Sequence, residues 1–111
     1  FFPSTTRSRR NILINPSVLY SSPQQLSGLM AHELGHVLGF RHEHIRPESG
    51  GTCLEGSSWR TITEYDPRSI MHYSRISCGG DGRTALTLSA QDIQGVAELY
   101  GKATFCGNGI T

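Results

Sequence analysis

The sequence predicts an α+β domain, and three observations lead to this fold class. Residues 23–38 and 90–100 each carry start and stop signals of an α-helix. Residues 11–15 form a short apolar run between turn formers, which favours a strand. Residues 48–82 are rich in Gly, Ser, Thr and Pro and follow no sustained period, which predicts irregular loops. With 111 residues and 36% hydrophobic content, we expect one small domain with a modest core, which metal or cross-links would help to stabilise.

The first helix is expected to run from Pro23 to Leu38, after the polar loop at residues 4–10 and the strand at 11–15. Ser22 can cap it, and proline is tolerated at the first helical position. Gly35 inside the helix costs about 1 kcal/mol relative to alanine, which indicates that another segment packs closely against it. The predicted apolar side of this helix consists of Leu26, Leu29, Met30, Val37 and Leu38.

The second helix is expected from Ala90 to Tyr100. Ser89-Ala90-Gln91-Asp92 is expected to cap its start, and Gly101 is a typical stop. Ile93, Val96, Ala97 and Tyr100 are predicted to share one face of this helix.

Charge and hydropathy exclude two classes of partner. Ten Lys and Arg against nine Asp and Glu give a formal charge of +1, which predicts neither a nucleic acid nor an anionic membrane as partner. No apolar run approaches the roughly 20 residues of a membrane span, and no signal peptide pattern is present at the first residues. We therefore expect a mature or trimmed product.

The segment from His32 to His42 combines three histidines, a carboxylate and a glycine at spacings that suit a metal ion. His32 and His36 are four residues apart, so both can present their imidazoles on one face of the helix. Gly39 can adopt the left-handed conformation that ends the helix and turns the chain back. His42 can then reach the same metal ion from another direction.

Three imidazole ligands leave the fourth position of a zinc ion open. A structural zinc site is closed by four protein ligands, whereas a catalytic site keeps a water whose pKa falls to about 7. Glu33 lies beside these ligands on the helix and is placed to act as a general base. The spacing therefore predicts a catalytic zinc centre with the ligands His32, His36 and His42.

A second motif, Ser69-Ile70-Met71-His72-Tyr73, follows further along the chain. With the zinc segment, it resembles the metzincin metallopeptidases, in which a tight turn with a methionine comes after the third histidine. The Ser-x-Met-x-Tyr pattern and Glu43, followed by His44-Ile45-Arg46-Pro47, are most similar to the astacin-type branch and to its bacterial secreted members. The resemblance covers about residues 1–100. It implies the C-terminal part of a metzincin-like catalytic domain, with the active-site helix, methionine turn and C-terminal helix present and most of the upper sheet missing.

The resemblance also implies roles for single residues. Glu33 is expected to take a proton from zinc-bound water as it attacks a peptide carbonyl, and to pass it to the departing amine. Tyr73 is expected to ligate zinc in the resting state and to hydrogen-bond the oxyanion, the alternative being a core aromatic beneath the metal. Met71 would form the hydrophobic floor under the imidazoles. In the family the glutamate at this place forms an ion pair with the mature N-terminus. Phe1 is not assumed to be that terminus, so Glu43 is interpreted as a supporting residue and not as a catalytic one. The remaining candidates, interpreted as structural, are His44, His72 and Trp59.

Two interpretations of function follow. In the first, residues 1–111 form a single peptidase domain of a secreted zinc endopeptidase that hydrolyses peptide or protein substrates. In the second, the chain is a noncatalytic zinc-binding fragment or processed half with a structural or partner-binding role. Residues 1–3 are expected to be the end of an edge strand of the upper subdomain. A separate N-terminal segment of the same enzyme is therefore an expected partner, and a fragment is favoured over an unusually reduced domain.

Three cysteines, Cys53, Cys78 and Cys106, lack the spacing of a zinc ribbon. Cys53 and Cys78 flank the methionine turn, so we expect a disulfide between them, worth about 2–4 kcal/mol. Cys106 would then remain outside the bridge. The alternative is three free thiols in a reducing compartment.

Overall fold

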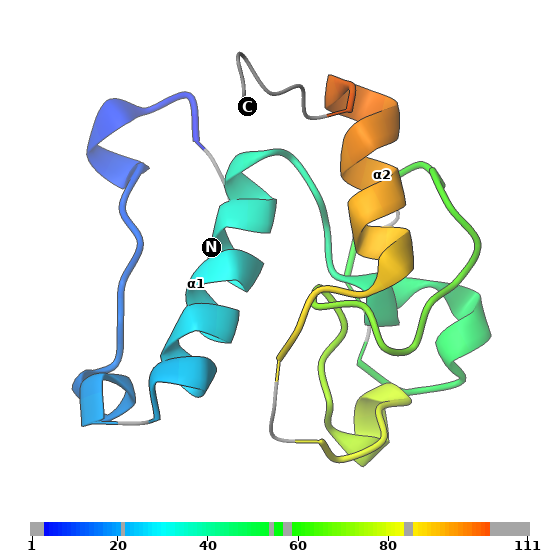
Figure 1. The fold of residues 1–111 in the computed structure, drawn as a ribbon, viewed down its shortest axis with the longest axis horizontal. Helices are drawn as coiled ribbons and strands as arrows, with labels where there is room; N and C mark the ends of the chain where they lie inside the picture. Colours follow the sequence, from blue (N-terminus) through cyan, green and yellow to red (C-terminus); the bar gives the residue numbers. More distant parts are fainter. Residues whose placement is uncertain (1–3, 21, 54, 57–58, 84–85, 103–111) are drawn as a thin grey trace, which may run out of the picture.

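The computed structural model describes residues 4–20, 22–53, 55–56, 59–83 and 86–102. The described part of the chain contains two α-helices, α1 (Pro23–Val37) and α2 (Ala90–Tyr100). Neither helix is long and apolar enough to cross a bilayer. Figure 1 shows α1 in the middle of the view, with the preceding segment on one side and α2 and the loops on the other. Short 3₁₀ turns complete the described structure, at Arg7–Arg9, Pro16–Tyr20, Glu43–Ile45, Pro47–Ser49 and Ile76–Cys78.

The predicted strand at residues 11–15 is wrong. This segment has no regular structure, and no strand occurs within the described ranges, so the sheet of the predicted α+β class is not found there. The segment lies beyond α1, away from the rest of the molecule, and the Leu13 side chain is 91% exposed. A strand needs a neighbouring strand to satisfy its backbone groups, and none lies beside this run. The two predicted helices are confirmed.

Helix α1 begins and ends as expected. Ser22 accepts a hydrogen bond from the Gln25 backbone N–H at 3.2 Å, and Pro23 occupies the first helical position. Gly39 has a φ of 98°, which confirms the left-handed turn after the helix. The predicted apolar side, however, is not the buried side. Its C-terminal members, Val37 and Leu38, are 48% and 40% exposed, whereas the buried residues of α1 are Gly28, His32 and His36.

Helix α2 matches its predicted bounds, and its predicted packing face is confirmed in part. Ser89 and Asp92 form the complete capping box, and Gly101 ends the helix with a φ of 86°. Val96 and Ala97 are half-buried as predicted, whereas Ile93 and Tyr100 are 61% and 59% exposed. The buried residue of α2 is Gly95, and Asp92 reaches the methionine turn at residues 69–73.

The interior of the described structure is more polar than apolar. The buried apolar residues are Ile45, Ile70, Met71 and Cys78. The buried polar residues are His32, His36, His42, His44, Arg46, Asp66, Ser69 and His72. Buried polar groups stabilise a fold only when they are hydrogen-bonded. The packing of this chain is therefore organised by hydrogen bonds around its histidines.

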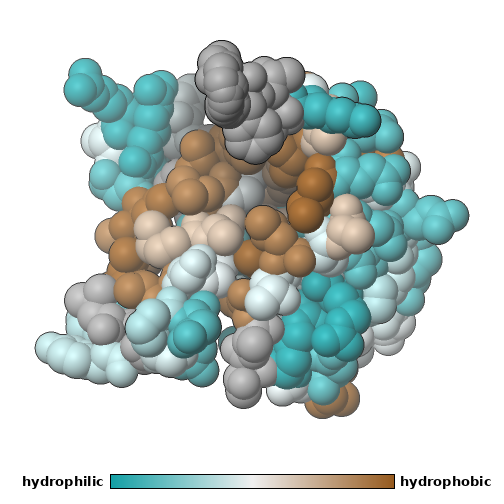
Figure 2. Space-filling view, viewed as in Figure 1, coloured by the Kyte–Doolittle hydropathy of each residue, from teal (hydrophilic) through white to brown (hydrophobic). Residues whose placement is uncertain are grey.

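An open apolar groove of about 600 Å³ lies between α1, α2 and the loop at residues 59–63. Figure 2 shows apolar side chains gathered around this hollow. Leu34 on α1 and Leu99 on α2 border it and are 51% and 38% exposed. Trp59 lines the groove as well, in agreement with its predicted packing role.

The loops from residue 48 to residue 82 are irregular, as predicted, and the expected disulfide ties them together. Cys53 and Cys78 are bridged, with 4.9 Å between their Cα atoms. Cys106 and the expected edge strand at residues 1–3 lie outside the described residues.

Gly35 provides a test of the packing between α1 and the methionine turn. A Cβ atom at this position would lie 2.5 Å from the Met71 sulfur, which is closer than van der Waals contact allows. We expect Gly35→Ala to lower the free energy of unfolding by about 1 kcal/mol, because overpacking outweighs the gain in helix propensity. Urea denaturation measures this change, with Ser27→Ala on the exposed side of α1 as the control. An increase in stability of Gly35→Ala matching that of the control would contradict the close packing.

Candidate metal centre

Helix α1 and the turn after it bring the three predicted ligands together. His32 and His36 project from one side of α1, and His42 returns to them after Gly39. The Nε2 atom of His42 lies 3.3 Å from that of His32 and 3.1 Å from that of His36. All three side chains are buried, and their nitrogens form a group with the spacing of metal ligands.

Each imidazole is held by a hydrogen bond from its other nitrogen. The Nδ1–H of His32 donates to the Ile70 carbonyl at 2.7 Å, and that of His36 donates to the Phe40 carbonyl at 2.8 Å. Carbonyl oxygens can only accept, so both protons reside on Nδ1. His42 Nδ1 lies 2.6 Å from the Glu55 carboxylate and donates to it in the same way. The three Nε2 lone pairs therefore face one another without a proton.

This donor set fits zinc. Two nitrogens bound to one tetrahedral zinc at about 2.0–2.1 Å from the ion lie about 3.3 Å apart, close to the two separations in the structure. Burial lowers the pKa of His36 to about 4 and also lowers the pKa of His42. Both rings are therefore neutral at pH 7, which is the form that binds a metal. Three lone pairs at this spacing repel one another unless a cation lies between them.

The predicted base and the predicted tyrosine border the same centre. Glu33 follows His32 on α1 and is partly buried. The Tyr73 ring centroid lies 4.5 Å from that of His42 and 6.2 Å from that of His32, and the side chain is 38% exposed. Burial raises the pKa of Tyr73, with further contributions from Glu55 and Glu33. Its hydroxyl therefore keeps its proton at neutral pH and can donate a hydrogen bond.

Two histidines outside the ligand set fix the backbone of Tyr73. The Tyr73 N–H donates to His44 Nδ1 at 3.2 Å, and His72 Nδ1–H donates to the Tyr73 carbonyl at 2.6 Å. The Tyr65 hydroxyl lies 2.7 Å from His72 Nε2, and the His44 ring stacks on the Tyr73 ring with 4.3 Å between centroids. His44 and His72 are 2% and 1% exposed, which agrees with their predicted structural roles. Both histidines thus hold the Tyr73 backbone in place.

The methionine turn is anchored to α2 through Asp92. One carboxylate oxygen accepts from Ser69 Oγ at 2.5 Å, and the other accepts from the Ile70 N–H at 2.8 Å. The Ile70 carbonyl in turn accepts from His32. Asp92 is therefore connected to a predicted zinc ligand through a single residue of the turn.

Glu43 supports the segment that carries the third histidine. Its Oε2 accepts from the Asp66 N–H at 2.8 Å, and its Oε1 lies 3.4 Å from Arg46 Nη1. Its own N–H donates to the Met71 carbonyl at 2.9 Å. Burial raises the pKa of Glu43, and the hydrogen bond from Asp66 and the charge of Arg46 oppose that rise. These contacts join the chain after His42 to the methionine turn.

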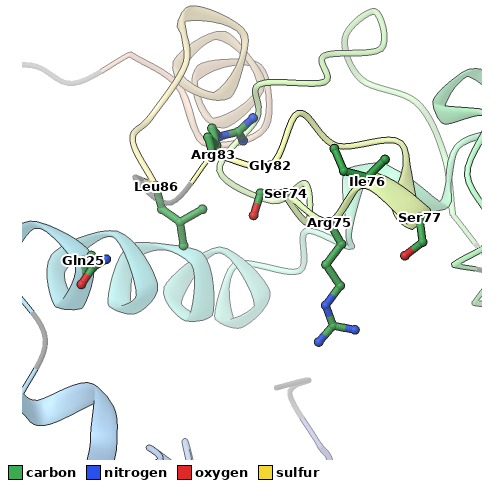
Figure 3. Close-up of a pocket in the computed structure, with 8 residues that line it drawn as sticks. All are labelled: Gln25, Ser74, Arg75, Ile76, Ser77, Gly82, Arg83 and Leu86. Carbon is green, nitrogen blue, oxygen red and sulfur yellow. The ribbon is translucent and has the colours of Figure 1, made fainter.

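An open pocket of about 770 Å³ borders the segment after Tyr73. Figure 3 shows the residues that line it: Gln25 and Leu86 on one side, Ser74, Arg75, Ile76 and Ser77 on the other, and Gly82 and Arg83 at its end. Arg83 is held by the carbonyls of Pro67 and Ser69. Arg75 lies over the Tyr73 ring, 5.7 Å from its centroid. The predicted zinc ligands do not line this pocket.

Sequence reasoning missed three residues of the site. Glu55 lies in an irregular loop, and no spacing connects it to His42. Asp92 was recognised only as a helix cap, because its second role depends on how α2 docks. Tyr65 was not singled out, although the buried histidine it contacts needs a partner. The capping box was the one signal that could have drawn attention to Asp92.

Comparison with known proteins finds relatives of this chain, one of them named as a metalloendopeptidase. The chain is 34% identical over 93 residues to Tolloid-like protein 2 of Homo sapiens, covering 68% of this chain and 9% of that protein. It is 31% identical over 100 residues to Bone morphogenetic protein 1 of Xenopus laevis, covering 74% and 14%. It is 28% identical over 102 residues to Astacin-like metalloendopeptidase of Mus musculus, covering 66% and 23%. The chain thus spans less than a quarter of the length of each of these relatives.

No family model and no solved structure matches the chain. The similarity to a protein named as an astacin-like metalloendopeptidase agrees with the resemblance in the zinc segment and the methionine turn. The expected bacterial secreted type stays a prediction.

Asp92 tests how the methionine turn is held. Asp92→Ala removes the acceptor for Ser69 Oγ and for the Ile70 N–H, and we expect it to lower the free energy of unfolding by about 1–3 kcal/mol. Urea denaturation measures the loss. Gln94→Ala, at an exposed position of α2, is the control and should change stability by less than about 0.5 kcal/mol. Equal stability of the two variants would show that the turn does not depend on Asp92.

Proposed function

We propose that this chain carries the catalytic centre of an astacin-type zinc metalloendopeptidase, which hydrolyses peptide bonds in peptide or protein substrates. The single observation that carries the proposal is the convergence of three unprotonated Nε2 atoms at 3.1 and 3.3 Å. The tyrosine of a methionine turn stands beside them. The sequence similarity to an astacin-like metalloendopeptidase supports the same family.

In this proposal His32, His36 and His42 hold the zinc, and Tyr73 is available as a further ligand. Zinc bound there would polarise the peptide carbonyl and make water a nucleophile at neutral pH. Glu33 would accept the proton of the attacking water and deliver it to the departing amine. Tyr73, as a protonated phenol, would donate a hydrogen bond to the oxyanion that forms in the transition state.

The proposed setting is extracellular. The Cys53–Cys78 bridge is the observation that supports it, because disulfides persist in oxidising compartments and are rare in reducing ones. Secretion also agrees with the bacterial secreted type predicted from the motifs. A peptidase in this setting meets its protein substrates outside the cell.

A second candidate function is favoured by one observation. The described residues contain no strand that could pair with an extended substrate, and an apolar groove lies open between α1 and α2. In this alternative the chain binds zinc but is a structural or partner-binding part, or it joins a separate N-terminal segment of the same enzyme. Peptidase activity of the protein as it is naturally produced distinguishes the alternatives, because a noncatalytic part would bind zinc without cleaving peptides.

A substitution at Glu33 distinguishes zinc binding from catalysis. We expect Glu33→Ala to retain one zinc ion while losing peptidase activity by at least about 10²- to 10⁴-fold, because the base is not a ligand. Zinc is counted by elemental analysis, and activity is measured on a peptide substrate with the protein as it is naturally produced. His36→Ala is the comparison and should lose the zinc. Cleavage by Glu33→Ala at the wild-type rate would refute the proposed base.

Tyr73→Phe tests a transition-state role. The ring and its packing against His44 remain, so zinc content should be unchanged while the hydroxyl is lost. We expect kcat to fall by about 10²- to 10³-fold and KM to change little, since the hydrogen bond forms only in the transition state. Steady-state kinetics measure both constants, and Tyr20→Phe, at a 90% exposed position, is the control. An unchanged kcat would leave Tyr73 with a packing role only.

A further inference from the structure

The three predicted ligands differ in what holds their rings. His32 and His36 donate from Nδ1 to backbone carbonyls, whereas His42 donates to the side chain of Glu55 at 2.6 Å. We propose that Glu55 is the positioning residue of the third zinc ligand, and that it sets the zinc affinity of the centre by fixing the ring and tautomer of His42. This inference rests on the proposed function, because it assumes that zinc lies between the three Nε2 atoms.

Three side chains that contact the Glu55 carboxylate are donors or cations. His42 Nδ1 and His44 Nε2 lie 2.6 and 3.6 Å from Oε2, and Arg41 Nη2 lies 3.9 Å from Oε1. His44 accepts the Tyr73 N–H at Nδ1, so its own proton is on Nε2 and faces Glu55. The carboxylate therefore has three donor groups within 3.9 Å.

His42 needs this support more than the other two ligands do. His32 and His36 are on α1, where the helix backbone fixes their directions. His42 lies in an extended conformation after the helix, with φ of −64° and ψ of 133°, and no regular element holds it. A carboxylate on the outer nitrogen orients such a ring and raises the basicity of the nitrogen that binds the metal.

The segment before Glu55 is itself firmly attached. Cys53 is bridged to Cys78, and the Thr52 N–H and hydroxyl both donate to the Ser77 carbonyl, at 2.8 and 3.2 Å. Gly51 packs directly against the Cys78 backbone. The Glu55 side chain, 27% exposed, follows this anchor by two residues. The disulfide therefore holds the loop from which Glu55 reaches His42.

Substitutions at Glu55 distinguish its possible contributions. Glu55→Gln keeps an oxygen that can accept from His42 Nδ1 but removes the charge. Glu55→Ala removes both, so the imidazole is free to rotate and to move its proton to Nε2. We therefore expect zinc affinity to decrease from wild type to Glu55→Gln to Glu55→Ala, with a loss of about 10- to 100-fold in the last.

The test measures the zinc Kd by competition with a chelator of known affinity, using the full chain with its disulfide intact. Urea denaturation of the metal-free proteins should give similar unfolding free energies, which separates positioning from general stability. The visible spectrum of the Co²⁺-loaded Glu55→Ala protein should differ from that of wild type, because the third ligand is no longer oriented. Glu98→Gln, an exposed carboxylate on α2, is the charge-matched control and should bind zinc as wild type does.

The outcomes separate this inference from the proposed function. If the wild-type chain fails to bind one zinc ion, the proposed function is wrong and the inference fails with it. If wild type binds zinc and Glu55→Ala binds it within twofold, or if Glu98→Gln weakens it equally, only the role of Glu55 is overturned. The pair Cys53→Ser and Cys78→Ser should weaken zinc binding, with little further loss when Glu55→Ala is added. Additive losses would show that the bridge does not act through Glu55.

Discussion

The whole described structure depends on bringing three imidazole nitrogens to one point with their lone pairs facing inward. That arrangement is repulsive in itself, and it persists because each ring is held from behind. His32 is tied to the Ile70 carbonyl, His36 to the Phe40 carbonyl and His42 to Glu55. Each partner comes from a segment that follows α1 in the chain. The hydrogen bonds that orient the three imidazoles thus join the helix, the turn after it and the loops.

The polar interior follows from the same demand. Among the described residues, buried histidines, Asp66, Ser69 and Arg46 outnumber the buried apolar side chains. The methionine turn is the junction of this network. Asp92 holds it from α2, Glu43 contacts it from the third-histidine segment, and Gly35 lets Met71 pack against α1. These three contacts connect the methionine turn to α2, to the segment after His42 and to α1.

Tyr73 combines a well-held backbone with a ring beside the predicted ligands. Its backbone is fixed by His44 and His72, while its ring borders the ligands and remains partly exposed. A donor whose main chain is held by hydrogen bonds and whose side chain is partly exposed suits the proposed role at the oxyanion. Glu55 contributes to the same region from the disulfide-anchored loop. The apolar groove lies on the α2 side of α1, and its lining includes His42 and Met71.

Local sequence determined the features that need only neighbouring residues. The bounds of α1 and α2, their caps, the left-handed turn at Gly39 and the spacing of His32 and His36 follow from side-chain chemistry within a few positions. The tertiary structure alone decided the rest. The run at residues 11–15 is not a strand, and among the described residues no partner strand lies beside it. The exposure of Ile93 and the contact of Asp92 with the methionine turn both follow from how α2 docks. Glu55 meets His42 across thirteen positions of irregular chain, where neither periodicity nor motif connects two residues, so only the folded loops could bring them together.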